Sequence, residues 1–276
     1  MASDTGAAWA DSLKVKPTAL LGFAMAIGYL GLFMVLEKFI GPSYTEIGKT
    51  SDSILRGIII PLAICTAVTA GLTTWLGWWR PVLREKPLGV KWMWAIPITL
   101  GVLVLVGVDW AQISSLSGTY LLLLAVGTLL VGFNEETVYR GLSLVAFRGA
   151  YKEVYVWLAT SILFGLLHGA NLFLGQALVP TIQQIGFAFV LGSVFYVVRR
   201  VTGSLAVLMI LHALWDFGSF TWAGAFAVTS IGPADLAGAN WAGLLMAARL
   251  PLQAVLVIMC LIGAKKLFTT PVEMAE

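Results

Sequence analysis

The sequence predicts an all-α polytopic membrane protein, and three observations lead to this. The 276-residue chain is 59% hydrophobic and only 11% charged, whereas soluble domains carry about a quarter charged residues. Its apolar residues gather in eight runs, most of them near the about 20 residues that a transmembrane helix needs. Its Lys and Arg residues alternate between successive loops. We therefore expect one integral-membrane domain, residues 1–276, a bundle of about eight transmembrane helices.

The apolar runs place these helices in order along the chain, each boundary to within about 3 residues. We expect spans at residues 18–37, 57–79, 92–108, 120–147, 154–174, 180–198, 203–222 and 241–264. The third span contains Pro97, which membrane helices tolerate. The fourth is the longest and contains the sequence GFNEETVYRG, whose charges interrupt an otherwise apolar run.

The basic residues predict the orientation of the bundle. Of the 17 Lys and Arg residues, 13 fall on one side of the expected membrane. These are Lys14, Lys16, Arg80, Arg84, Lys86, Lys91, Arg140, Arg148, Lys152, Arg199, Arg200, Lys265 and Lys266. Because cytoplasmic loops carry the excess of Lys and Arg, we expect both termini in the cytoplasm. The net charge of +3 is read through this distribution, and it does not indicate a nucleic-acid partner.

Polar side chains at membrane depth need a partner or a function. The expected spans contain Glu135, Glu136, Arg140, His168, His212, Asp216 and Arg249. On a helix, Glu136 and Arg140 share a face and neutralise each other, whereas Glu135 points about 100° away and stays free. The alternative is that these charges simply mark a helix end at the membrane interface.

Both histidines of the chain fall inside spans. Phe164 and His168 are four residues apart on one helix face, and so are His212 and Asp216, so that Asp216 is expected to accept a hydrogen bond from His212. Each histidine read alone is also compatible with a helix-packing role. By the rise per residue, His212 lies about 12 Å, Glu135 about 18 Å and His168 about 21 Å from the cytoplasmic ends of their spans. We therefore expect an acid–base cluster near the middle of the bundle.

Three motifs on three spans, EETVYR (135–140), FGLLH (164–168) and HALWD (212–216), resemble those of one membrane-protease family. This is the CPBP family, also called the CAAX-protease or Abi family, which includes the CAAX prenyl endopeptidase. The resemblance covers roughly residues 120–220. It implies an endopeptidase in which Glu135 activates a water and His168 helps to hold it. His212 and Asp216 would stabilise the oxyanion, while Glu136, Arg140 and Phe164 shape the site.

One position departs from the family pattern. Asp216 stands where the prenyl-peptidase branch typically has Asn, and an ionised carboxylate cannot donate a hydrogen bond. Aspartate is common in bacterial relatives, so the resemblance still allows activity, but the departure weakens the expectation that the substrate is a prenylated CAAX protein. Asp216 would then act by holding His212 in one tautomer or in its cationic form.

The resemblance implies no cofactor, and no HExxH zinc signature is present. Glu135, His168, His212 and Asp216 nevertheless have the side-chain types that bind divalent metals. Cys65 and Cys260 lie in separate apolar runs and predict neither a disulfide nor a metal site. We expect Arg249 to extend to the interface or to pair with a polar group such as Asp235, without a catalytic role.

The expected partners are a membrane-associated protein or peptide substrate and the lipid bilayer. The composition favours a bacterial inner membrane, with the endoplasmic reticulum as the alternative. A non-catalytic scaffold, assembly factor or subunit of a membrane complex is the main competing function. A transporter with a proton relay is the third, and the absence of an internal repeat argues against it.

Overall fold

The computed structural model describes residue 10, residues 13–223 and residues 241–274. Within these residues the elements are all helices, which confirms the all-α prediction. The main helices are α2 (Ala19–Ile40), α4 (Ile60–Leu76), α6 (Ala95–Val106), α8 (Gly118–Glu136), α10 (Glu153–Leu167), α12 (Leu178–Thr202), α13 (Leu205–Ala223) and α15 (Trp241–Thr269). Short α-helices are α3 (Ser51–Ile54), α5 (Trp79–Leu83), α7 (Trp110–Ile113), α9 (Ser143–Arg148) and α11 (Ala170–Phe173). Two 3-10 turns, η1 (Tyr44–Glu46) and η3 (Lys91–Trp94), and two π-helical segments, η2 (Leu55–Ile59) and η4 (Thr137–Leu142), complete the described elements.

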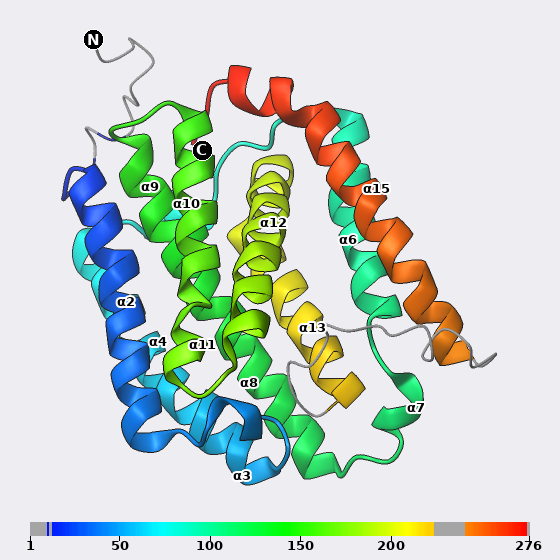
Figure 1. Ribbon diagram of the computed structural model, residues 1–276. Coiled ribbons are helices and arrows are strands. Elements are labelled where there is room, and N and C mark those ends of the chain that lie inside the picture. Colours follow the sequence, from blue (N-terminus) through cyan, green and yellow to red (C-terminus); the bar gives the residue numbers. More distant parts are fainter. Residues whose placement is uncertain (1–9, 11–12, 224–240, 275–276) are drawn as a thin grey trace.

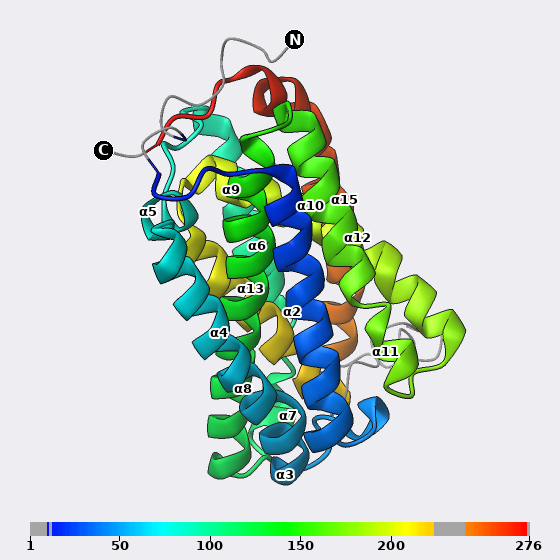
Figure 2. The ribbon, with the colours of Figure 1, turned by 90° about the vertical axis from the view of Figure 1, so that its left-hand side faces the viewer.

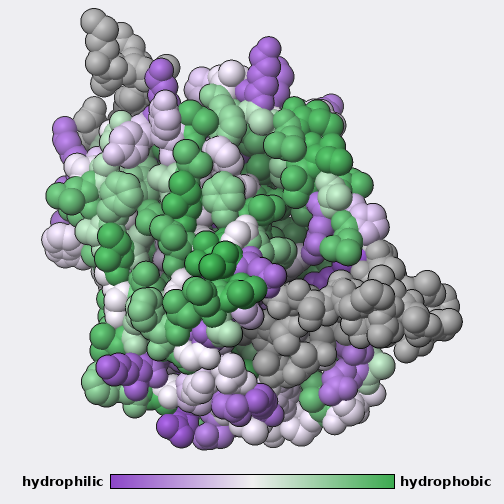
Figure 3. Space-filling view, in the orientation of Figure 1, coloured by the Kyte–Doolittle hydropathy of each residue, from purple (hydrophilic) through white to green (hydrophobic). Residues whose placement is uncertain are grey.

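Each of the eight predicted spans corresponds to an apolar helix (Figure 1). In the part of the chain that the structure describes, six helices are long and apolar enough to cross a membrane. Two shorter apolar helices, Lys91–Val106 and Leu205–Thr221, account for the third and seventh predicted spans. Apolar side chains cover most of the middle of the face in Figure 3, and hydrophilic ones gather at its upper and lower ends. The chain is therefore a multi-pass membrane protein.

Local sequence signals set the ends of these helices. The side-chain oxygen of Thr18 accepts a hydrogen bond from the backbone N–H of Leu21 and so caps α2. Ser117 caps α8 in the same way. Such caps satisfy N–H groups that have no partner inside the helix. At its other end α12 stops at Gly203, whose φ of 67° favours glycine.

Close backbone approaches hold two helix pairs together. Helix α8 packs against α13, and a Cβ at Gly132 of α8 would overlap the carbonyl oxygen of Met209 in α13. Helix α10 packs against α12, where Gly165 lies against the backbone of Ile185. Small residues at such contacts let membrane helices approach closely. Helix α2 lies beside α4 and α9 and completes one wall of the bundle (Figure 2).

A buried ion-pair cluster fixes the end of the bundle at which α2 begins and α15 ends. The Glu85 carboxylate, in the loop after α5, contacts Arg148, Arg199 and Arg200 at 2.8–3.1 Å. Burial alone raises the pKa of this carboxyl, but the three arginines outweigh it and lower that pKa to about 2. Glu153 pairs with Arg148 on the opposite flank at 2.6 Å. The sequence placed these three arginines on one side of the membrane, and this cluster confirms that they lie together.

Two apolar clusters form the interior. The larger one contains Tyr29, Phe164 and Leu167, and the smaller one contains Tyr44 and Ile58. Residues of both clusters line a single cavity, which therefore lies where the two clusters meet. The polar residues at membrane depth face this part of the molecule.

Candidate functional site

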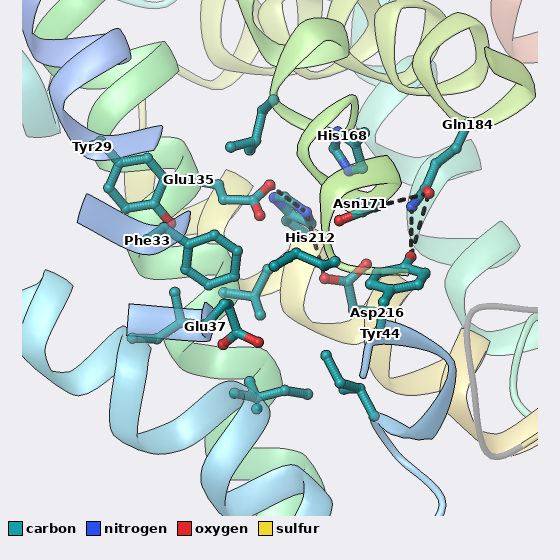
Figure 4. Close-up of a pocket in the computed structure, with 17 residues that line it drawn as sticks. Tyr29, Phe33, Glu37, Tyr44, Glu135, His168, Asn171, Gln184, His212 and Asp216 are labelled. Carbon is teal, nitrogen blue, oxygen red and sulfur yellow. Dashed lines mark hydrogen bonds and ion pairs between the residues drawn. The ribbon is translucent and has the colours of Figure 1, made fainter. Parts of the chain in front are cut away.

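The cavity has a volume of about 90 Å³ and is enclosed by α2, the η1–α4 region, α8, the end of α10, α11, α12 and α13 (Figure 4). Its lining includes Glu135, His168, His212 and Asp216. A second cavity of about 370 Å³ adjoins it between α12 and α13 and shares His168, His212 and Asp216. A cavity of this size has room for water molecules. The structure thus brings the four residues predicted as catalytic to the lining of one cavity.

Glu136 does not line the cavity, and its carboxyl group contacts two side chains. Its Oε1 atom accepts a hydrogen bond from Nη1 of Arg140 at 3.1 Å, and both side chains are fully buried. This confirms that Glu136 and Arg140 share a helix face. The same Oε1 atom lies 2.7 Å from Nδ1 of His212. Glu136 therefore joins Arg140 to the imidazole of a different helix.

The surroundings of His212 differ from the sequence prediction. Asp216 was expected to accept a hydrogen bond from His212, but its nearest oxygen lies 3.6 Å from Nε2, beyond a good hydrogen bond. Glu136 takes that role at Nδ1, because Gly132 lets α8 approach α13 closely. A carboxylate paired with Arg140 only accepts, so Nδ1 of His212 donates. The imidazole Nε2 then carries a proton only in the imidazolium form, and it faces Asp216 and Glu135, at 3.6 and 3.9 Å.

Glu135 points into the cavity on the other side of His212 (Figure 4). Its side chain is 15% exposed, and its Oε2 atom is buried without a hydrogen-bond partner within the described residues. The two neighbouring glutamates thus differ in the way that their spacing predicts. Glu136 is held by Arg140 and His212, whereas Glu135 lines the cavity and has a carboxyl oxygen without a hydrogen-bond partner in the described part of the chain.

A π-helical segment, Thr137–Leu142, follows directly after these glutamates. Segments of this kind are rare and often occur at functional sites, because the wider turn displaces the side chains that it carries. Arg140 lies within it, and its guanidinium carbon lies 3.9 Å from the centre of the Phe164 ring. A side chain at Gly192 would overlap both Arg140 and Phe164. The Arg140 guanidinium therefore lies between the Phe164 ring and the backbone at Gly192.

His168 ends helix α10 at the cavity. Its Nδ1 atom lies 3.0 Å from the carbonyl oxygen of Phe164, to which it donates. In the neutral imidazole this leaves Nε2 as an acceptor. The Phe164 ring packs edge-on against both histidines, with ring centres 5.2 Å from His168 and 5.8 Å from His212. Phe164 thus fixes both imidazoles as well as Arg140.

Several polar residues of the cavity were not singled out in the sequence. The Asn171 amide donates to Gln184 at 3.0 Å, and Gln184 is also bonded to the Tyr44 hydroxyl. Asn171 lies three residues after the end of the FGLLH motif, so its position was a usable signal. Glu37 also lines the cavity, at the end of the first predicted span. It was missed because a charge at a span boundary resembles an interfacial residue.

Arg249 lies outside this cavity. It is 4% exposed, and its guanidinium carbon lies 5.5 Å from the centre of the Trp215 ring, so the prediction that it extends to the interface is wrong. Its suggested partner Asp235 lies outside the described residues. Across the described ranges, no three His, Cys, Asp or Glu side chains are arranged to hold a metal ion.

Fold and site together define a polytopic α-helical membrane protein that gathers carboxyl and imidazole groups around a cavity with room for water. Residues 117–218 match the family model described as Rce1-like, Type II CAAX prenyl endopeptidase. The predicted resemblance to the CAAX-protease family is confirmed for this segment of the chain. The matched segment contains all three motifs, whereas α2 and α15 lie outside it. Neither a curated protein nor a solved structure matches the chain.

Proposed function

We propose that this protein is an intramembrane endopeptidase in which Glu135 activates a water molecule. The observation that carries the proposal is the arrangement of Glu135 and His212. Glu135 lines the cavity, and its Oε2 atom, which has no hydrogen-bond partner in the described residues, lies 3.9 Å from Nε2 of an imidazole whose Nδ1 is held by Glu136. A base and a hydrogen-bond donor that line the same cavity are what peptide hydrolysis by water requires.

The reaction follows from these positions. Glu135 takes a proton from the water, and the oxygen of that water attacks the scissile carbonyl carbon. The carbonyl electrons move to its oxygen, and Nε2–H of the His212 imidazolium donates to the resulting oxyanion. Glu135 then passes its proton to the leaving amine, and the C–N bond breaks without a covalent acyl-enzyme. Each of these contributions is worth typically 10²–10⁴-fold in rate.

The neighbouring residues position the reacting groups. His168 holds the water, since its Nε2 atom is free to accept a hydrogen from it. Glu136 fixes the tautomer of His212 and, with Arg140 and Phe164, holds its ring. Asp216 lies near Nε2 of His212 and favours its cationic form through its charge.

The substrate class that fits is a membrane-associated protein or peptide, because the cavity lies among helices that cross the bilayer. The cytoplasmic placement of the termini and the bacterial inner membrane stay predictions. The competing function is a scaffold or subunit of a membrane complex that keeps the polar cluster for stability.

Quantitative profiling of peptide termini separates these functions. Membranes from cells with the wild type, Glu135→Gln or the exposed control Glu273→Gln are compared at matched protein levels. We expect new termini with the wild type and the control, and their loss with Glu135→Gln. Identical profiles for all three folded proteins would reject the protease and favour the scaffold.

A further inference from the structure

A carboxyl group outside the family domain lies in the same cavity as the proposed catalytic groups. Glu37 is in the last turn of α2 and is 2% exposed. Both of its carboxyl oxygens are buried without a hydrogen-bond partner within the described residues. It lines the cavity together with Glu135, His168 and His212.

The position is unfavourable for an acidic side chain that has only a structural role. Glu37 lies at the C-terminal end of its helix, where the helix dipole is negative and favours cations. A buried carboxylate without a partner is strongly destabilising, and one that packs helices together would show a hydrogen bond. The adjacent Lys38 is exposed, and it donates no hydrogen bond to the Glu37 carboxyl. Gly41 leaves the space that this carboxyl occupies, since a Cβ there would overlap it.

Acidic side chains also outnumber basic ones in the lining of the cavity. Three carboxyl groups line it, those of Glu37, Glu135 and Asp216, and no lysine or arginine does. His212 faces Glu135 and Asp216, His168 is bonded to the Phe164 carbonyl, and among the described residues no group donates a hydrogen bond to the Glu37 carboxyl. The missing positive charge is one that a ligand can bring.

We propose that Glu37 binds a cationic side chain, lysine or arginine, of the peptide substrate. This inference rests on the proposed endopeptidase function. In the view of Figure 4 the Phe33 ring lies between the carboxyls of Glu135 and Glu37. The cation therefore belongs to a residue some positions from the scissile bond, and its aliphatic stem packs along Phe33. Glu37 sets which peptide is held, and Glu135 cuts it.

The test uses the purified full-length protein in liposomes and a peptide library. At each position the library carries lysine, arginine, uncharged norleucine or glutamate. The wild type is expected to favour lysine or arginine over norleucine at one position by tenfold or more in kcat/KM. Glu37→Gln is expected to reduce that ratio to below threefold. Glu46→Gln, an exposed acid already paired with Lys49, is the matched control and keeps the wild-type ratio.

Binding separates this inference from the proposed function. In the Glu135→Gln background, a fluorescent lysine peptide selected from the library is expected to bind at least tenfold tighter than its norleucine counterpart, and adding Glu37→Gln removes the difference. If the wild type cleaves peptides without a basic preference, Glu37 is not a specificity residue although the protease stands. If nothing is cleaved but basic peptides bind through Glu37, the protease is rejected and the cation site stands.

Thermal unfolding of Glu37→Gln adds a readout that a packing role would move differently. Glu37 is an acid without a hydrogen-bond partner among the described residues, at the C-terminal end of α2, where the helix dipole disfavours negative charge. Its replacement by Gln is therefore expected to keep or raise the unfolding midpoint of the ligand-free protein. A lowered midpoint together with unchanged selectivity would overturn the inference and make Glu37 structural.

Discussion

The Nδ1 atom of His212 lies 2.7 Å from the carboxyl oxygen of Glu136 that also binds Arg140. Glu136 lines neither cavity, so it reaches the substrate only through the imidazole that it holds. It is therefore a positioning residue and more than a neutralising partner of Arg140. This contact links two of the family motifs, EETVYR and HALWD, across the α8–α13 interface.

Glu136→Gln is expected to lower kcat about 10²-fold, since a misplaced donor loses most of its effect on the oxyanion. KM should change less than threefold, because Glu136 does not touch the cavity. The change also leaves Arg140 buried without a counter-charge, which costs about 3–5 kcal/mol. Steady-state kinetics on the first peptide from terminus profiling measures the split. A change in KM with kcat unchanged would contradict a positioning role.

Asp216→Asn should keep activity within about tenfold of the wild type, because Glu136 and not Asp216 holds Nδ1 of His212. The amide also restores the residue type of the prenyl-peptidase branch and adds a possible donor. The same kinetic assay, run beside Glu136→Gln, gives the ranking of the two variants. An Asp216→Asn protein as inactive as Glu135→Gln would show that the Asp216 charge itself is essential.

Glu85 predicts how stability depends on pH at one end of the bundle. Its pKa is lowered from the ordinary 4.5 to about 2, so its contribution is complete above pH 4.5 and is lost as pH falls toward 2. A shift of this size corresponds to about 3 kcal/mol. Glu85→Gln should lower the unfolding midpoint at neutral pH and flatten the decline between pH 4.5 and 2. Thermal unfolding in detergent across this pH range tests this prediction. If the unfolding midpoint of the variant falls between pH 4.5 and 2 as steeply as that of the wild type, the prediction is contradicted.

Gly132→Val is expected to separate α8 from α13, since a side chain there overlaps the Met209 carbonyl. Overpacking costs about 1–3 kcal/mol, and a displacement of about 1 Å at Glu136 and His212 costs roughly 10²-fold in rate. Gly71→Val is the matched control, because a Cβ at Gly71 meets nothing within 4 Å. Unfolding midpoints and kcat/KM of the two variants are compared. Equal behaviour would show that the close approach at Gly132 is not required.

The sequence predicted some features of this molecule better than others, for physical reasons. Burial in lipid imposes long apolar runs, so all eight spans were recognisable, and helical periodicity was sufficient to pair Glu136 with Arg140. The contact between Glu136 and His212 was not predictable, because it depends on how closely two helices approach at Gly132. Helical spacing favoured Asp216 as the partner of His212, and a tertiary contact replaced it. Glu37 was missed because only the folded bundle shows that a span boundary faces inward.

The two cavities share His168, His212 and Asp216 as a common wall. A reaction at such a partition can receive its two reactants from opposite compartments. A peptide in the roomier chamber between α12 and α13 would present one face of its carbonyl to the wall, while water waits in the smaller chamber beside Glu135. Residues of the larger chamber would then guide the substrate backbone, while the smaller chamber contains both Glu37, which holds the cationic side chain, and Glu135, which cuts the bond.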